Sequence, residues 1–240
     1  MNKFANIPSK HKLPVKTIIV NPTNKHTATL FFFHGSGSSG SDVETWLSSL
    51  TSRKLTFPHI KIVYPSAPSQ PYTPLGGLPS NVWFDRSAVA ISAPEKKTSL
   101  DSMCTAVSDL IDKEVASGIP LFRIVIGGFS MGGALALHVA YRYKKSLAGC
   151  VTMSSFLNNN SLVYEALKLE GGQNTPPLLQ FHGSSDSLVP LKWGVTTHNT
   201  LKSFGVRSEL VTLEGVEHEL VDTEVEHLKE WLLNVIPETS

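Results

Sequence analysis

Few charged residues and almost no excess of one sign characterise this 240-residue sequence. Charged residues make up 17% of the chain, and 21 Lys and Arg residues nearly balance 20 Asp and Glu residues, for a net charge of +1. A chain so close to neutral lacks the basic surface by which proteins bind nucleic acid or an anionic membrane surface. With hydrophobic residues at 41%, the composition also excludes a disordered chain, a coiled coil and a collagen-like repeat.

Cysteine is almost absent, and no long hydrophobic run occurs. The two cysteines, Cys104 and Cys150, follow no spacing typical of a metal or redox site, so we expect free buried thiols in a reducing compartment. The longest apolar stretches, such as 30–33 and 124–126, have the length of strands and are too short to span a membrane. The N-terminus lacks the apolar core of a signal peptide, and Asn2 replaces the glycine that N-myristoylation requires. These absences predict a soluble cytoplasmic protein without stable membrane insertion; a lipid attached to a cysteine stays an open alternative.

What the sequence does contain is an alternation of short apolar segments with segments of helical length. The expected strands are 17–20, 29–33, 60–64, 123–127, 149–153, 178–182 and 209–213, and the expected helices are 42–50, 98–117, 131–143, 193–204 and 222–236. The helix over 98–117 begins with a capping-box pattern, Thr98 and Asp101. Continuous apolar strands are typical of a mostly parallel sheet with helices on both faces, which is an α/β fold. We expect one such domain over 15–240, preceded by an N-terminal extension over 1–14.

One segment, 65–97, interrupts this alternation. It contains six prolines and the pair Gly76-Gly77, which is too much proline for a helix and too little alternation for a confident strand. A loop of this length in a compact domain is usually functional or disordered. The apolar island Val82-Trp83-Phe84 predicts that the segment packs onto the domain, where Trp83 and Phe84 either help to shape a pocket or only add to the core.

A nucleophilic serine is indicated by the segment Gly128-Phe129-Ser130-Met131-Gly132, which follows an apolar strand and precedes an Ala- and Leu-rich helix. In this G-x-S-x-G elbow, small neighbours let strand and helix approach while the serine takes a strained conformation at the carboxyl end of the strand. The elbow aims the amide of Met131 at a developing oxyanion, above the helix N-terminus. The alternative is a glycine-rich turn with an incidental serine, which the flanking strand and helix disfavour.

A serine hydroxyl needs a base to take its proton and an acid to orient that base, and in this architecture acid and histidine follow the serine in that order. Asp186 lies in the loop after a buried strand, at the edge of the sheet where ligands bind. Of the five histidines after Ser130, three fall inside expected helices, and His182 at a strand end is expected to be packed and hydrogen-bonded. His218 lies between the last strand and the last helix. We therefore predict Ser130, Asp186 and His218 as catalytic residues, with Asp222 as a fallback acid whose position is more typical of a helix N-terminal cap.

The turn His34-Gly35-Ser36-Gly37-Ser38-Ser39-Gly40 also follows an apolar strand. Its glycines match G-x-G-x-x-G, but no carboxylate ends the next strand to bind a ribose, and no lysine follows Gly40 as in a P-loop. The turn is better interpreted as an oxyanion loop, in which the backbone amide near Ser36 pairs with that of Met131 and His34 fastens the loop by hydrogen bonds. No cofactor or metal is expected, since neither H-E-x-x-H nor a clustered Cys/His spacing occurs.

These motifs, taken in order along the chain, resemble those of the acyl-protein thioesterase and lysophospholipase family. They are Phe33-His34-Gly35-Ser36-Gly37, Val82-Trp83-Phe84-Asp85, the elbow around Ser130, His182-Gly183 with Asp186, and Val216-Glu217-His218. The resemblance extends from about residue 19 to about residue 236. It implies an α/β-hydrolase fold, a Ser130–Asp186–His218 triad, and an oxyanion hole made by the backbone amides of Ser36 and Met131.

Two departures from the family pattern concern the substrate. Those enzymes usually carry Leu-Gly-Asp after the His-Gly pair and Gln after the nucleophile, where this chain has Ser36-Gly37-Ser38 and Met131. Oxyanion binding by backbone amides is unaffected, but the smaller and more polar Ser36 changes the pocket lining, so activity on palmitoyl chains is not implied. We expect hydrolysis of an acyl ester or thioester, including an S-acylated protein, by a monomer or weak dimer. Lysophospholipase activity, a catalytically silent hydrolase-like binding protein and, less favoured, a peptidase are the alternatives.

Overall fold

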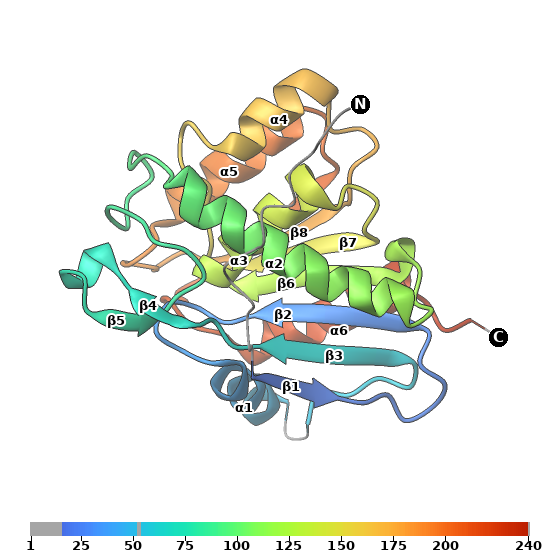
Figure 1. Ribbon diagram of the computed structural model, residues 1–240. Coiled ribbons are helices and arrows are strands. Elements are labelled where there is room, and N and C mark those ends of the chain that lie inside the picture. The colour runs from blue at the N-terminus through green and yellow to red at the C-terminus, as the bar shows by residue number, and fades with distance from the viewer. Residues whose placement is uncertain (1–15, 52–53, 240) are drawn as a thin grey trace, which may run out of the picture.

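The computed structural model describes residues 16–51 and 54–239, so the expected N-terminal extension over 1–14 lies outside the described residues. Within the described part, a seven-stranded sheet of order β1-β3-β2-β6-β7-β8-β9 runs through the molecule (Figure 1). The strands are β1 (Thr17–Val20), β2 (Ala28–Phe33), β3 (Ile60–Pro65), β6 (Ile124–Phe129), β7 (Gly149–Met153), β8 (Leu178–Gly183) and β9 (Ser208–Leu213). Neighbouring strands pair in parallel except for β1, which lies antiparallel to β3 at the edge. The mostly parallel sheet expected from the sequence is confirmed.

Helices cover both faces of the sheet (Figure 1). They are α1 (Gly40–Leu50), α2 (Lys97–Ala116), α3 (Met131–His138), α4 (Leu162–Glu170), α5 (Leu191–Ser203) and α6 (Asp222–Val235). Successive side chains of a strand point to opposite faces, so Leu30 and Phe32 of β2 pack with α1 and α6, whereas Phe31 and Phe33 pack with α2 and α3. Both cores are apolar because the central strands are buried on both sides.

Several predicted elements differ from the observed ones in detail. The helix expected over 131–143 is α-helical only as far as His138 and continues as a π-helical turn, Val139–Tyr143. The strand expected over 123–127 extends to Phe129, and Arg123 belongs to the preceding 3-10 turn, Leu121–Arg123. Helix α4 has no counterpart in the prediction. Single-residue shifts at strand ends, by contrast, are the ordinary uncertainty of element boundaries.

Both predicted helix caps are wrong. Helix α2 begins after Lys96 without a side-chain cap, and Asp101 instead binds Lys97 and the Arg142 guanidinium. Helix α6 begins after Val221, whose N–H donates to Glu224 Oε1 at 2.9 Å, and Asp222 is the first residue of the helix. Asp101 is thus held by ion pairs, and Asp222 Oδ1 accepts from the N–H of the neighbouring Thr223 at 2.7 Å.

The proline-rich segment folds into a small structure of its own. A two-stranded antiparallel sheet, β4 (Ser69–Pro71) and β5 (Pro79–Asn81), encloses a 3-10 turn, Thr73–Leu75. Figure 1 shows this hairpin beside the carboxyl ends of β2 and β3. The apolar island that follows it is buried, with Val82 and Trp83 at 0% exposure, so the predicted packing of the segment is confirmed. The strands escaped prediction because each is only three residues long and contains a proline, Pro71 in β4 and Pro79 in β5.

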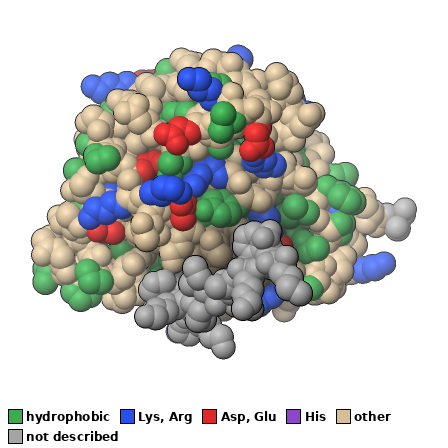
Figure 2. Space-filling view, turned by 45° about the horizontal axis from the view of Figure 1, so that its top comes forward, with side chains coloured by type: hydrophobic (Ala, Val, Ile, Leu, Met, Phe, Trp, Pro, Cys, Tyr) green, Lys and Arg blue, Asp and Glu red, His purple; other side chains and the backbone are tan. Residues whose placement is uncertain are grey.

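Charged side chains of both signs are distributed over the surface. Figure 2 shows Lys and Arg side chains interspersed with Asp and Glu side chains on one face. Several of them form ion pairs, as Lys97 does with Asp101 within α2 and Lys145, in the turn before β7, does with Glu170 at the end of α4. In the part of the chain that the structure describes, no helix is both long enough and apolar enough to cross a membrane.

Candidate active site

Ser130 lies between β6 and α3 in a backbone conformation that residues with side chains rarely adopt, with φ 53° and ψ −119°. Its N–H donates to the carbonyl oxygen of Met153 at 2.8 Å, and its carbonyl oxygen accepts from Ser155 Oγ at 2.8 Å. These bonds to β7 and to the residues that follow it hold the strained backbone in place. The serine therefore sits at the carboxyl end of β6, where the elbow pattern predicts it.

Two glycines beside Ser130 are required by close backbone contacts. A Cβ on Gly128 would lie 2.5 Å from the carbonyl oxygen of Phe33, and a Cβ on Gly132 would lie 2.2 Å from the same oxygen. Neither position can hold a side chain without displacing β2. The close approach also brings the loop after β2 to the serine, since a Cβ on Gly35 would lie 3.4 Å from Ser130 Cβ.

Asp186 lies in the loop after β8 and is only 5% exposed. Its Oδ1 accepts hydrogen bonds from the backbone N–H groups of Leu188, at 3.0 Å, and Val189, at 2.7 Å. Two backbone donors thus fix the plane of the carboxylate. The second oxygen, Oδ2, lies 2.7 Å from His218 Nδ1.

His218 connects the carboxylate to the serine. Its Nε2 lies 3.0 Å from Ser130 Oγ, and its ring packs against that of Phe129 with centroids 4.8 Å apart. Because Asp186 accepts at Nδ1, the proton of the neutral imidazole resides on Nδ1 and the lone pair of Nε2 faces the serine hydroxyl. The structure therefore brings the three predicted residues into one hydrogen-bonded chain.

The other candidates lie outside this chain. His182 is fully buried, and its Nε2 donates to the carbonyl oxygen of Val189 at 2.7 Å, as predicted for a packed histidine. Burial lowers the pKa of His182, which keeps the ring neutral. Asp222 is exposed at the start of α6, and it is Asp186 that lies beside His218. The remaining downstream histidines lie on helices, as expected: His138, His198 and His227.

The loop after β2 is fastened by His34. The ring is fully buried, its Nε2 accepts from the N–H of Ala67 at 2.9 Å, and its Nδ1 donates to the carbonyl oxygen of Gly35 at 2.6 Å. Burial lowers the pKa of His34, in keeping with this neutral form. The predicted fastening role of this histidine is borne out by these contacts.

Ser36 and Met131, the two predicted amide donors, lie next to each other. The Ser36 hydroxyl donates to Met131 Sδ at 3.6 Å. Met131 is the first residue of α3, whose N-terminal amides have no acceptor within the helix. Among the described residues, no carbonyl or side chain accepts from the N–H of Ser36 or of Met131, so both amides can bind a substrate oxygen.

A pocket of about 450 Å³ opens beside Ser130 and His218. Its walls come from the loop after β2 with α1, from the proline-rich segment, and from the loop after β8. The residues that line it include Ser36, Val43, Trp46, Tyr72, Pro74, Leu75, Arg86, Val89, Leu188 and Val189. The proline-rich segment therefore does shape a pocket, although Trp83 and Phe84 belong to the core and other residues of the segment form the wall.

Sequence reasoning missed most of this lining. Trp46 on α1 reaches the site by packing its ring on Phe129, with centroids 5.2 Å apart, and no local pattern marks it. Arg86 lies two residues after the apolar island 82–84, with Asp85 between them, and charged residues next to a buried island were the available signal for it. No cluster of His, Cys, Asp and Glu side chains that could hold a metal ion occurs among residues 16–51 and 54–239.

Comparison with known proteins identifies the family of this chain. The model of the Phospholipase/Carboxylesterase family matches residues 15–236, which is nearly the whole chain. The chain belongs to the phospholipase/carboxylesterase family. Among relatives in this family, it is 49% identical to lysophospholipase-like protein 1 of Mus musculus, covering 98% of this chain and 97% of that protein. It is 33% identical to acyl-protein thioesterase 1 of Neurospora crassa, with 93% of each chain covered.

A solved structure extends the comparison to the fold. The crystal structure of Zea mays acyl-protein thioesterase 2 superposes with a TM-score of 0.77 at 28% sequence identity, covering 92% of this chain and 99% of that one. The α/β-hydrolase fold that the motifs imply is thereby confirmed, and with it the resemblance to acyl-protein thioesterases and lysophospholipases. The chain is therefore a hydrolase of this family.

Proposed function

We propose that this protein hydrolyses carboxylic esters or thioesters through an acyl-enzyme formed on Ser130. The observation that carries the proposal is the hydrogen-bonded chain from Ser130 Oγ through His218 to Asp186, with distances of 3.0 and 2.7 Å, at the edge of an apolar pocket. A nucleophile, a base and an orienting carboxylate in this order are the machinery of acyl transfer. Membership of a family of esterases and thioesterases supports the same chemistry.

Acylation begins when His218 Nε2 takes the proton of Ser130 Oγ as the oxygen attacks the acyl carbonyl carbon. Asp186 holds the ring in the required tautomer and stabilises the imidazolium that forms. Collapse of the tetrahedral intermediate breaks the bond to the alcohol or thiol, and His218 returns its proton to that leaving group. Water, deprotonated by His218, then attacks the acyl-serine and releases the carboxylic acid and the free enzyme.

The oxyanion of each tetrahedral intermediate is assigned to the amides of Ser36 and Met131. Backbone donors held by a rigid loop and a helix N-terminus need no reorganisation when the charge develops, which makes them effective in a site shielded from water. His34 stabilises this arrangement, because the hydrogen bonds of its ring hold the backbone of the loop that contains Ser36. Removing such a donor typically lowers kcat by about 10²- to 10³-fold.

Chain-length selectivity tests the proposal and refines it. We would measure kcat/KM for a series of acyl esters and thioesters from acetyl to palmitoyl, with Ser130→Ala as the blank. A value that rises toward long chains identifies a lipid pocket and an acyl-protein thioesterase or lysophospholipase. A value that peaks at short chains identifies a short-chain carboxylesterase.

The matched control is Ser203→Ala, a change of an exposed serine at the end of α5, which should match the wild type throughout the series. A Ser130→Ala protein that retains more than a few per cent of the wild-type kcat would contradict the assignment. Failure of the wild type both to turn over any ester and to react with a fluorophosphonate would instead indicate a hydrolase-like binding protein.

A further inference from the structure

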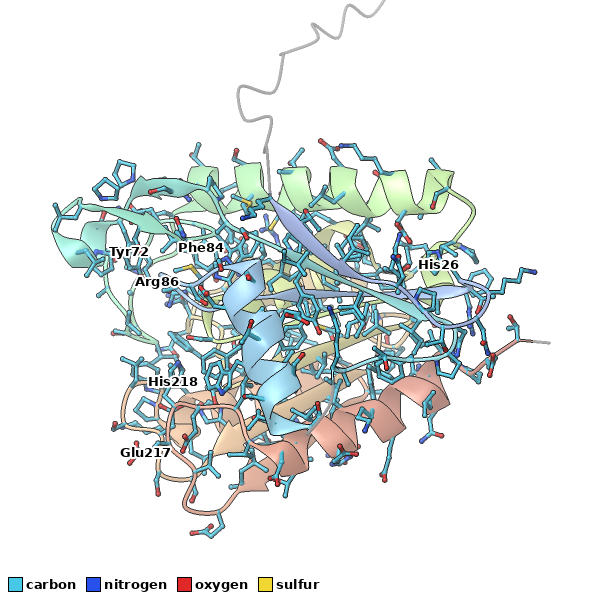
Figure 3. All side chains as sticks on the ribbon, turned by 90° about the horizontal axis from the view of Figure 1, so that it is seen from below. His26, Tyr72, Phe84, Arg86, Glu217 and His218 are labelled. Carbon is cyan, nitrogen blue, oxygen red and sulfur yellow. The ribbon has the colours of Figure 1, made fainter. Side chains whose placement is uncertain are left out.

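Among the described residues, a single formally charged side chain lines the pocket described above. Arg86 contributes to its wall, and no Lys, Asp or Glu is among the other lining residues. Apolar and small polar side chains, such as Val43, Pro74 and Leu75, form the rest. Figure 3 shows Tyr72, Phe84 and Arg86 close together at the same edge of the molecule as His218, while His26 lies at the opposite edge. A lone cation in an apolar pocket calls for a physical explanation.

In the part of the chain that the structure describes, no carboxylate pairs with the guanidinium of Arg86. Its Nε is buried without a hydrogen-bond partner, and it forms no ion pair with any described residue. The charge of Glu95 acts on Arg86, but the two side chains form no ion pair. Glu95 Oε2 accepts from the N–H of Leu162 at 2.9 Å, and its buried Oε1, which lies 3.1 Å from His138 Nε2, has no hydrogen-bond partner among the described residues. Arg86 instead packs over the ring of Phe84, with its Cζ 5.1 Å from the ring centroid.

The charge on Arg86 persists in this position. Burial lowers the pKa of its guanidinium, and the nearby Tyr72 and Glu95 oppose that shift. Arginine remains protonated in proteins because its ordinary pKa is so high. The pocket wall therefore carries a permanent positive charge that no carboxylate among the described residues pairs with directly.

Tyr72 supplies a second unsatisfied donor in the same wall. Its side chain is 4% exposed and its hydroxyl is buried without a partner. The 3-10 turn fixes the position of the residue, since its N–H donates to the carbonyl oxygen of Leu78 and its carbonyl oxygen accepts from the N–H groups of Leu75 and Gly77. A buried hydroxyl and a buried guanidinium nitrogen that lack acceptors are both costly, unless a ligand supplies the acceptors.

We propose that Arg86 and Tyr72 form an anion subsite that binds a carboxylate or phosphate group of the substrate, away from the bond that is cleaved. A guanidinium presents its donors in a plane that matches the two oxygens of such a group, and a phenol hydroxyl adds a third donor. The apolar lining lowers the dielectric around the pair and strengthens the attraction. This inference rests on the proposed ester hydrolysis and names its substrate class: esters that bear one anionic oxygen group.

The test compares esters of equal length that differ in charge. The first arm uses p-nitrophenyl pentanoate and mono-p-nitrophenyl glutarate, which differ in a terminal carboxylate on the acyl chain. The second arm uses butyryl glycerol and butyryl glycerol 3-phosphate, which differ in a phosphate on the leaving alcohol. In one of the two arms we expect the wild type to favour the anionic ester by about tenfold or more in kcat/KM, as for a charge-assisted hydrogen-bonded pair. The arm that responds identifies the part of the substrate that carries the charge.

Variants assign the selectivity to the two residues. Arg86→Gln should lower the anionic-to-neutral ratio of kcat/KM by about tenfold, Arg86→Lys should lower it less, and Tyr72→Phe should lower it by about threefold. Arg207→Gln is the matched charge control, because Arg207 is exposed and absent from the pocket. Tyr164→Phe is the matched hydroxyl control, because its hydroxyl is likewise buried without a partner but does not line the pocket.

A binding measurement separates failure of the subsite from failure of the catalytic proposal. Calorimetric titration of mono-p-nitrophenyl glutarate and butyryl glycerol 3-phosphate into Ser130→Ala protein needs no turnover, and adding Arg86→Gln should weaken binding of the responsive ester about tenfold. Neutral esters hydrolysed in a Ser130-dependent manner, with no charge preference in either arm, would leave the catalytic proposal intact and overturn the subsite. A charge preference unaffected by both Arg86 variants would overturn it as well. If no ester is turned over but the Arg86-dependent binding is present, the subsite stands and the catalytic proposal fails.

Discussion

The indole Nε1–H of Trp83 donates to the carbonyl oxygen of His34 at 2.8 Å, and both residues are fully buried. This bond ties the middle of the proline-rich segment to the loop that presents the Ser36 amide. The ring of Trp83 also lies edge-on against that of Phe33, with centroids 5.1 Å apart. The same contact thus supports both the pocket wall and the oxyanion loop.

Trp83→Phe should therefore weaken both stability and catalysis. It leaves the carbonyl oxygen of His34 buried without its donor and opens a small cavity, for a loss of about 1–3 kcal/mol in the free energy of unfolding. We expect kcat to fall more than KM rises, because the loop positions an oxyanion donor. Urea denaturation and steady-state kinetics measure the two effects. Trp193→Phe, at a half-buried tryptophan outside the pocket, should be nearly neutral, and an equal effect in both variants would argue against the specific role of Trp83.

Asp186→Asn should lower kcat by about 10³- to 10⁴-fold with little change in KM, because an amide cannot stabilise the His218 imidazolium and favours the wrong tautomer. Asp222→Asn, the same change at the fallback acid, should leave kcat near that of the wild type. Steady-state kinetics on one ester is sufficient. The assignment of the acid would be reversed by a large loss in the Asp222 variant and a small one in the Asp186 variant.

Gly132→Ala should destabilise the protein by several kcal/mol and abolish activity. The added Cβ would lie 2.2 Å from the carbonyl oxygen of Phe33, so α3 must move away from β2 and carry Ser130 with it. Gly118→Ala is the control, since a Cβ there meets nothing within 4 Å and costs only the strain of its φ of +107°. Denaturant midpoints and kcat should separate the two variants clearly. A Gly132→Ala protein as stable as Gly118→Ala would show that the elbow tolerates a wider spacing.

Glu224 should make stability depend on pH. Burial raises the pKa of this carboxyl to about 8 from its ordinary 4.5, and the hydrogen bond from Val221 N–H opposes the shift only in part. Between these two values the folded chain keeps a proton that the unfolded chain has lost. Stability therefore falls as pH rises through this window and levels off above it.

Glu224→Gln, which is neutral at every pH, should remove this dependence. Its stability relative to the wild type should increase by about 1 kcal/mol or more between about pH 5 and about pH 9. Urea denaturation of both proteins across that range provides the measurement. Parallel stability curves for the two proteins would mean that Glu224 ionises near its ordinary pKa in the folded state.

Much of the site could be located from sequence because its signals are local. The elbow needs a serine between glycines within five residues, and the steric reason is visible in the contacts that Gly128 and Gly132 would make. Asp186 and His218 could be predicted because each follows a predicted strand, and parallel strands place their carboxyl ends at the same edge of the sheet. Helix α4 and the π-helical turn had no comparable local signal, and the caps assigned to Thr98 and Asp222 depended on partners that the pattern could not show.

The sequence by itself determined the alternation of strands and helices, the mostly parallel sheet and the strained serine, because backbone hydrogen bonding, hydrophobic periodicity and glycine sterics act over a few residues. Only the tertiary structure decided which side chains meet. His218 lies 88 positions from Ser130 and 32 from Asp186, and their contacts exist because separate loops converge at one edge of the sheet. The position of Arg86 in the pocket wall is likewise a property of packing, since none of its described neighbours forms an ion pair with it.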